Sequence, residues 1–256
     1  MTQDTVRPDG TLPPPAPTGG WSLVLPLKPL GLAKSRLARF AGPHRADLAL
    51  SFALDTVTAA LACPGVSRVL VVTGDPRAGE RLAALGAVVV ADEPGGGLNA
   101  ALRHGAAYAR RTGPDAPLAA LSADLPALRP AELARVLAAV PTGGPGGRAF
   151  LADAPGLGTT LLACAPGARL APAFGEGSRA RHAAGGAYEI TLPDVPSVRR
   201  DVDTGEDFVQ ALALGVGPYT AAGGGGGAPG GGRGPGPPPP RPPPPPPAHA
   251  PPPPAP

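Results

Sequence analysis

The chain of 256 residues contains few of the residues that mark several large classes of protein. Its two cysteines, Cys63 and Cys164, lack the paired spacing of a zinc site, and two cysteines do not make a disulfide framework. No stretch approaches the roughly 18 apolar residues of a membrane span, and the N-terminus has no apolar signal segment. We therefore expect free, buried thiols, no membrane partner and a cytoplasmic location.

Aromatic residues are also scarce, at 4% of the chain. The formal charge of +3 includes Arg233 and Arg241 near the C-terminus, so the remainder is close to neutral. A nucleic-acid-binding surface usually shows a basic stripe with interleaved aromatic residues, and this sequence has none. Nucleic acid is therefore not the expected partner.

The ends of the chain differ in composition from its centre. Residues 1–20 are rich in proline and polar, and residues 220–256 are almost wholly Gly, Pro and Ala. Neither segment has enough apolar side chains to offset the entropy of ordering, so both are expected to be disordered extensions of one domain at residues 21–219. The proline run of the tail is either a polyproline II segment that binds a partner or a passive extension.

The centre alternates short apolar runs with helical patterns, which predicts an α/β fold with a mostly parallel sheet. Short connections between these elements imply right-handed crossovers. The expected strands are Trp21–Leu27, Arg68–Thr73, Ala87–Ala91, the run from Leu118, Ala149–Ala152 and Thr159–Ala165; the expected helices are Ala46–Leu61, a short one ending at Leu85, Asn99–Arg111, Pro130–Val140, and two more near Ser178 and after Thr204.

One carboxylate follows the most uniformly apolar of these strands. Asp124 stands in L-A-A-L-S-A-D-L-P-A-L, just past the expected end of a strand buried on both faces. In open α/β sheets, ligands bind outside the carboxyl ends of the strands, so this side chain is expected to point into the site. The alternative, a cap for the helix at Pro130, is disfavoured because Asp124 lies six residues upstream.

Lysine is nearly absent, and its two occurrences fall in one loop. Lys28 and Lys34 stand with Arg36 in K-P-L-G-L-A-K-S-R, against twenty arginines in the chain. The lysine ammonium is a compact point charge, whereas the arginine guanidinium is a planar fork. Lysine retained only in this loop therefore suggests a point charge fitted against a phosphate. Ordinary solvated charges are the alternative.

A run of three glycines precedes the chain's single asparagine. Gly95 to Gly97 allow a ligand to approach the backbone, and a helix beginning near Asn99 offers free N–H groups. The amide of Asn99 has donors and an acceptor, which suits the edge of a base. A helix cap explains it equally well.

Two further motifs carry polar groups in the second half. In F-G-E-G-S-R-A-R-H, Gly175 and Gly177 precede Ser178 at an expected helix start, which forms either an anion-binding nest or a simple cap. In D-V-D-T-G-E-D, Asp201 and Asp203 alternate along an extended segment and so face one side, where they bind either magnesium or nearby arginines.

Six motifs in order make the chain resemble the guanylyltransferases of coenzyme F-420 biosynthesis, the phosphoenolpyruvate or 2-phospho-L-lactate guanylyltransferase family. They are L-P-L-K-P-L-G-L-A-K-S-R-L, G-L-N-A-A-L, A-D-L-P-A-L, G-T-T-L-L, F-G-E-G-S-R-A-R-H and D-V-D-T-G-E-D. The resemblance implies a single Rossmann-like, GT-A-like nucleotidyltransferase domain that joins GTP to a small phosphorylated acid and releases pyrophosphate.

Roles carried over by position complete the expected site. Thr160, Gly175 and Ser178 match family residues that hold phosphoenolpyruvate, although Thr160 alone would be read as an ordinary strand residue. Asp124, Asp201 and Asp203 match carboxylates that bind Mg²⁺. Lys28, Lys34 and Arg36, with Asn99, are assigned to the nucleotide, and Asp124 and Lys28 to catalysis.

Three alternatives stay open at this point. The acceptor is phosphoenolpyruvate, 2-phospho-L-lactate or 3-phosphoglycerate, since all are small anionic acids. Another nucleotidyltransferase of the same fold, acting on a sugar phosphate or the molybdenum cofactor, is the runner-up. A proline-rich interaction protein is the alternative from a different class. The oligomeric state is left undetermined by the sequence.

Overall fold

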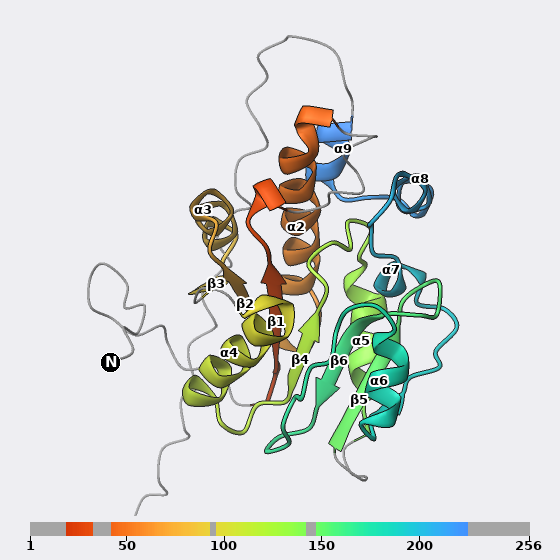
Figure 1. The fold of residues 1–256 in the computed structure, drawn as a ribbon. Coiled ribbons are helices and arrows are strands. Elements are labelled where there is room, and N and C mark those ends of the chain that lie inside the picture. The colour runs from red at the N-terminus through yellow and green to blue at the C-terminus, as the bar shows by residue number, and fades with distance from the viewer. Residues whose placement is uncertain (1–18, 33–41, 93–95, 142–146, 225–256) are drawn as a thin grey trace, which may run out of the picture. The chain divides into compact units, whose positions relative to one another are not determined.

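The structure is a computed structural model, and it describes residues 19–32, 42–92, 96–141 and 147–224. Within these ranges the chain forms one seven-stranded sheet with helices on both faces (Figure 1). Its strands are β1 (Trp21–Leu27), β2 (Val66–Thr73), β3 (Val88–Ala91), β4 (Leu118–Leu121), β5 (Arg148–Ala152), β6 (Thr159–Cys164) and β7 (Tyr188–Glu189). The expected α/β class is confirmed.

The strand order is β3-β2-β1-β4-β6-β5-β7. All the pairings are parallel except those of β6, which is antiparallel to both β4 and β5. The sheet is therefore mostly parallel, as the sequence predicts. The reversal at β6 follows from its short connection to β5, because a turn of a few residues can join only antiparallel strands.

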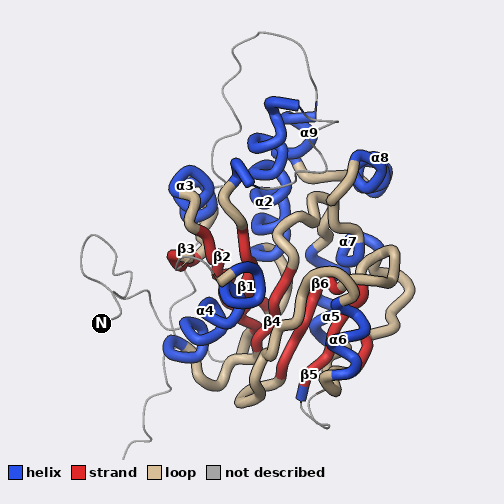
Figure 2. Tube along the Cα trace, in the orientation of Figure 1, coloured by secondary structure: helices blue, strands red, loops and turns tan. Residues whose placement is uncertain are grey.

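Helices form two layers around this sheet (Figure 2). One face carries α4 and α6, and the opposite face carries α2, α3 and α5. The helices are α2 (Arg45–Leu61), α3 (Pro76–Ala84), α4 (Gly97–Thr112), α5 (Pro130–Ala138), α6 (Ser178–Ala184), α7 (Pro196–Arg199), α8 (Gly205–Leu214) and α9 (Pro218–Gly224), with 3-10 turns at Leu30–Leu32 and Gly42–His44.

Strand β4 shows why a run of Leu and Ala forms the centre of this sandwich. Leu118 and Ala120 face the cluster under α4, whereas Ala119 and Leu121 face the cluster under α2 and α5. All four side chains are buried. A strand covered on both faces needs apolar residues at every position, which explains the missing alternation.

The C-terminal part adds two helices that pack outside the sheet. The helix expected after Thr204 is α8, and Thr204 and Asp207 form a capping box at its start. The carboxylate of Asp55 accepts hydrogen bonds from the backbone N–H groups of Tyr219 and Thr220, at 3.0 and 2.7 Å. These two bonds anchor α9 on α2, and α9 continues to Gly224, past the boundary at 219 that composition suggests.

Other expectations concern thiols, membranes and the chain ends. Cys63 and Cys164 are free and buried, as predicted, and burial raises the pKa of Cys63 to about 11. No helix in the described ranges is long and apolar enough to cross a membrane.

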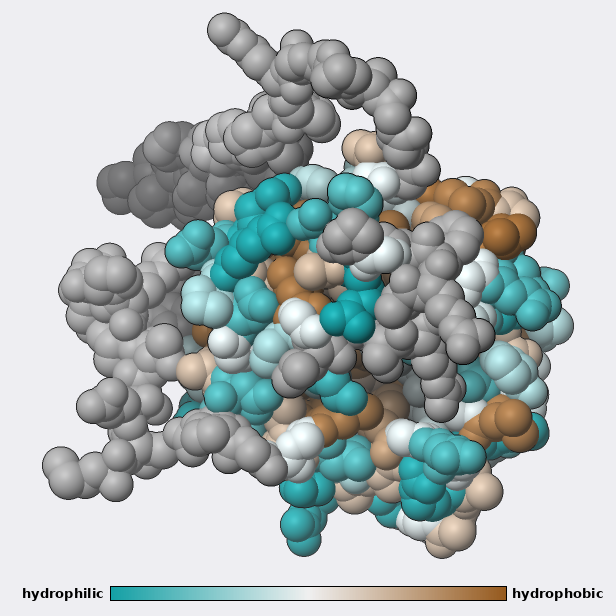
Figure 3. All heavy atoms as spheres, turned by 45° about the horizontal axis from the view of Figure 1, so that its top comes forward, coloured by the Kyte–Doolittle hydropathy of each residue, from teal (hydrophilic) through white to brown (hydrophobic). Residues whose placement is uncertain are grey.

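On the face shown in Figure 3, apolar residues are interspersed with polar ones. Residues 1–18 and 225–256, which hold most of the expected disordered extensions, lie outside the described ranges.

Candidate functional site

Strands β2 and β3 lie on one side of β1, and β4 lies on the other side. The strand order therefore reverses between β1 and β4, whose carboxyl ends lie side by side. Such switch points are where open α/β sheets bind ligands. A cavity of about 720 Å³ lies there, within the usual size of a small-molecule site. Six of the predicted site residues line it: Lys28, Asp124, Gly175, Ser178, Asp201 and Asp203.

Asp124 is placed by the turn that follows β4. Its neighbours Ala123 and Leu125 are buried, and the backbone N–H of Leu125 donates to the Thr56 hydroxyl at 3.0 Å. Thr56 in turn donates to the Phe52 carbonyl of α2. The turn is thus fixed from the helix layer below, and the half-buried Asp124 side chain lies at the cavity wall.

Asp201 and Asp203 reach the same cavity from the other end of the chain. Val202 between them is fully buried, so both neighbours point away from the core, as the alternation predicts. The Asp207 carboxylate accepts from the N–H of Thr204 at 2.9 Å and from the Arg200 guanidinium at 3.0 Å. This network fixes the segment that carries the two aspartates.

The three aspartates do not form a preassembled metal site. Among the described residues, no three His, Cys, Asp or Glu side chains are close enough together to hold a metal ion by themselves. The oxygen-only donor set still suits Mg²⁺, which keeps several waters and binds through one or two carboxylates together with substrate phosphates.

Lys28 is exposed at the cavity, directly after β1. The following turn is fixed by Asp75, whose carboxylate accepts from the Leu30 N–H at 2.9 Å. Lys34 and Arg36, the other two cations of the predicted phosphate loop, lie outside the described residues.

Two of the three residues predicted to bind the acid substrate line the cavity, and the third does not. Gly175, with φ of 115°, and the buried Ser178 line the cavity. Ser178 is the first residue of α6, and Gly177 takes the cap position, so the expected serine cap is not formed. Thr160 lies just behind the wall: its backbone carbonyl accepts from the Ser122 N–H, and its buried hydroxyl has no hydrogen-bond partner in the described part of the chain.

Asn99 makes a contact that the sequence did not indicate. Its amide nitrogen donates to the carbonyl oxygen of Phe174 at 3.0 Å, and its amide oxygen accepts from the Phe174 N–H at 2.8 Å. It does not cap α4, whose N-cap residue is Gly96. The assignment of Asn99 to the nucleotide base stays a prediction.

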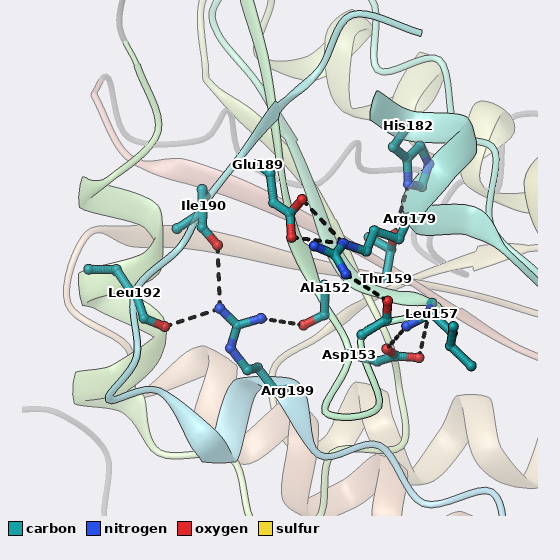
Figure 4. A network of polar contacts seen from close by, with 12 residues as sticks. Ala152, Asp153, Leu157, Thr159, Arg179, His182, Glu189, Ile190, Leu192 and Arg199 are labelled. Carbon is teal, nitrogen blue, oxygen red and sulfur yellow. Dashed lines mark hydrogen bonds and ion pairs between the residues drawn. The ribbon is translucent and has the colours of Figure 1, made fainter. Parts of the chain in front are cut away.

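His182 was not singled out by any motif argument. It is 3% exposed, and its Nδ1 lies 3.0 Å from the Thr159 hydroxyl (Figure 4). Its Nε2 lies 3.0 Å from the backbone nitrogen of Ala173. Burial, followed by the nearby Arg181 and Arg148 guanidinium groups, lowers the pKa of His182 to about 4. A single histidine after two arginines gave no sign in the sequence that it would bind the backbone of Ala173.

The arginines of the same motif are engaged with the protein rather than turned to the cavity. Arg179 pairs with Glu189 at 3.0 Å (Figure 4) and also donates to the Gly156 carbonyl. Arg181 donates to the carbonyls of Ala173 and Glu176. These two arginines therefore fix the two loops that border the cavity.

Comparison with known proteins assigns the chain to a family. A family model described as a MobA-like NTP transferase domain matches residues 47–190. A phosphoenolpyruvate guanylyltransferase of Streptomyces coelicolor is 68% identical over 203 residues, which cover 79% of this chain and 94% of that protein. The chain belongs to the phosphoenolpyruvate guanylyltransferase family. The resemblance drawn from the six motifs is confirmed.

Further comparisons agree with this family. A phosphoenolpyruvate guanylyltransferase of Thermomonospora curvata is 60% identical over 202 residues, covering 79% of this chain and 87% of that protein. Among solved structures, one assigned to a nucleotide-diphospho-sugar transferase of Desulfovibrio desulfuricans G20 has a TM-score of 0.53 at 19% identity, covering 72% of this chain and 82% of that one. At that identity the likeness shows the nucleotidyltransferase fold alone.

Proposed function

We propose that the protein joins GTP to phosphoenolpyruvate and forms enolpyruvoyl-2-diphospho-5'-guanosine and pyrophosphate, a step of coenzyme F-420 biosynthesis. The observation that carries this proposal is the 68% identity to a phosphoenolpyruvate guanylyltransferase over 94% of that protein. The cavity at the switch point supports it, because residues assigned to both substrates line one space. A cytoplasmic location, where GTP is available, is part of the proposal.

The chemistry is an in-line displacement at phosphorus. A phosphate oxygen of the acid attacks the α-phosphorus of GTP, a new P–O bond forms, and the bond to the β-phosphate oxygen breaks to release pyrophosphate. Phosphate monoesters are largely dianionic near neutral pH because their second pKa is about 6, so the nucleophile needs no general base. Lys28 would bind the triphosphate, and Gly175 and Ser178 would bind the acid.

The charge of the cavity supports a divalent cation as cofactor. Five carboxylates of the described residues line it, Asp124, Asp153, Glu176, Asp201 and Asp203, against the single ammonium of Lys28. Two polyanionic substrates that bind in a cavity lined by carboxylates need cations to neutralise their negative charge. Mg²⁺ held by Asp124, Asp201 and Asp203 would neutralise charge on the transferred and leaving phosphates.

The acceptor is tested by supplying each acid in turn. The full chain is incubated with GTP and Mg²⁺ plus phosphoenolpyruvate, 2-phospho-L-lactate or 3-phosphoglycerate, and pyrophosphate release is followed with the product mass. Fastest turnover with phosphoenolpyruvate is expected, and replacing GTP by ATP, CTP or UTP should abolish most of it. Faster turnover with either other acid, or with a sugar phosphate, would show that phosphoenolpyruvate is not the acceptor.

A further inference from the structure

The segment from Ala173 to Glu176 forms part of the cavity wall, with Phe174 and Gly175 lining the space. It belongs to no helix or strand, so its backbone groups need partners from elsewhere. Most of those partners are side chains. Asn99, His182 and Arg181 together bind both backbone polar groups of Ala173, both of Phe174 and the carbonyl of Glu176.

Asn99 binds Phe174 as one strand binds another. It donates to the Phe174 carbonyl and accepts from the Phe174 N–H, so a single side chain satisfies both groups of one residue. The contact joins the first turn of α4, which follows the glycine-rich segment, to the wall that carries Gly175. An amide is required, since a carboxylate accepts only and an ammonium donates only.

His182, in α6, binds Ala173, the residue before Phe174. Because the Ala173 N–H can only donate, Nε2 of His182 must accept, and the neutral ring then carries its proton on Nδ1 and donates it to the Thr159 hydroxyl. The ring also packs edge-on against Phe174, with centroids 5.1 Å apart at 74°. Hydrogen bonds and packing therefore fix the orientation of this ring relative to the wall.

We propose that Asn99 and His182 are positioning residues for the acid substrate. Acting through the backbone of Ala173 and Phe174, they hold Gly175, and through it Ser178, whose N–H donates to the Gly175 carbonyl at 3.0 Å. The wall is thereby set before the acid binds, so binding does not have to order it. This inference rests on the proposed function, in which Gly175 and Ser178 contact the acid.

The hold on the wall is tested first without substrates, on the full chain. Amide hydrogen exchange is measured for Ala173 and Phe174 in the wild type, in Asn99→Ala, in His182→Leu and in the control His104→Leu, which makes the same substitution at a half-buried histidine of α4. Exchange of the Phe174 amide in Asn99→Ala, and of the Ala173 amide in His182→Leu, should accelerate at least roughly tenfold, the factor for one lost hydrogen bond. Rates equal to those of the control would overturn the proposal.

Steady-state kinetics on the same variants separate positioning from general stability. Asn99→Ala and His182→Leu should raise the KM for phosphoenolpyruvate by roughly tenfold and leave the KM for GTP nearly unchanged, whereas His182→Gln, which restores an acceptor near Nε2, should recover the wild-type acid KM. Equal changes in both KM values, or a rise for GTP alone in Asn99→Ala, would contradict the proposal; the latter result would support base binding by Asn99.

The proposed function and the positioning role of Asn99 and His182 can be overturned separately. Absence of turnover by the wild type with every acid would remove the proposed function, and with it the assignment to the acid. The exchange rates, measured without substrates, would still decide whether Asn99 and His182 hold the wall. Normal wild-type turnover with unchanged acid KM in both variants would overturn the positioning role alone.

Discussion

The backbone N–H of Val202 donates a hydrogen bond of 3.1 Å to the carbonyl oxygen of Asp124. This bond joins the turn after β4 to the segment before α8, which are far apart in the sequence. It places the turn that carries Asp124 beside the segment that carries Asp201 and Asp203, and all three residues line one cavity.

Asp124→Asn should abolish most turnover and preserve the fold. This turn is held by the bond from the Leu125 N–H to the Thr56 hydroxyl and by that from the Val202 N–H to the Asp124 carbonyl, and Asn has nearly the same size as Asp. Losing a carboxylate that serves a cation at the reacting phosphate should cost several kcal/mol, or at least roughly 100-fold in kcat. Circular dichroism and thermal unfolding report the fold. The exposed Asp47→Asn serves as the control, and magnesium-dependent activity within about tenfold of the wild type would remove Asp124 from the site.

Lys28→Ala should weaken the use of GTP more than that of the acid. The ammonium is exposed at the cavity directly after β1, where it can pair with a triphosphate. A lost charged contact of about 1.5–3 kcal/mol raises the KM for GTP by roughly one to two powers of ten. Equal increases in both KM values would indicate a structural role for Lys28.

Ser178→Ala should raise the KM for the phosphorylated acid by roughly tenfold or more, because a hydroxyl bound to a charged group contributes about 1.5–3 kcal/mol. Gly177 is the cap of α6, and no side-chain cap bond is formed, so removing the hydroxyl should leave the melting temperature nearly unchanged. Kinetics and thermal melts on one preparation decide the matter. A lowered melting temperature with an unchanged acid KM would exclude Ser178 from the site.

The titration of His182 should be visible in the pH dependence of stability. Its folded pKa of about 4 lies below the usual value of 6.5, because burial disfavours the charged ring and Arg181 and Arg148 repel it. Between these two values the unfolded chain binds more protons than the folded one, so the free energy of unfolding falls as the pH falls through this window. Above it, the contribution is constant.

The measurement is denaturant unfolding at several pH values across that window. His182→Gln lacks the titrating ring, so its stability should fall less steeply between pH 6.5 and 4 than that of the wild type. Other groups, such as the buried Asp55, titrate in both proteins and cancel in the comparison. Parallel curves for the two proteins would show that the buried ring does not have the lowered pKa.

The sequence by itself determined the main strands and helices, the family and a set of candidate site residues. Strand β1 was predicted with the bounds that it has, and β4 was predicted as buried on both faces, since the apolar pattern is a local consequence of burial. Asp124 was identified because a charge after such a strand has few structural explanations. The order of the six motifs identified the family.

The tertiary structure alone decided how these parts meet. The pairing of β6 with β4, the docking of α9 through Asp55 and the contacts of Asn99 and His182 with Ala173 and Phe174 all join segments distant in the sequence. A side chain's local pattern states what it can donate or accept, but not which backbone group folding places opposite it. The wall of the cavity is built from such pairs, so it could be read only from the folded chain.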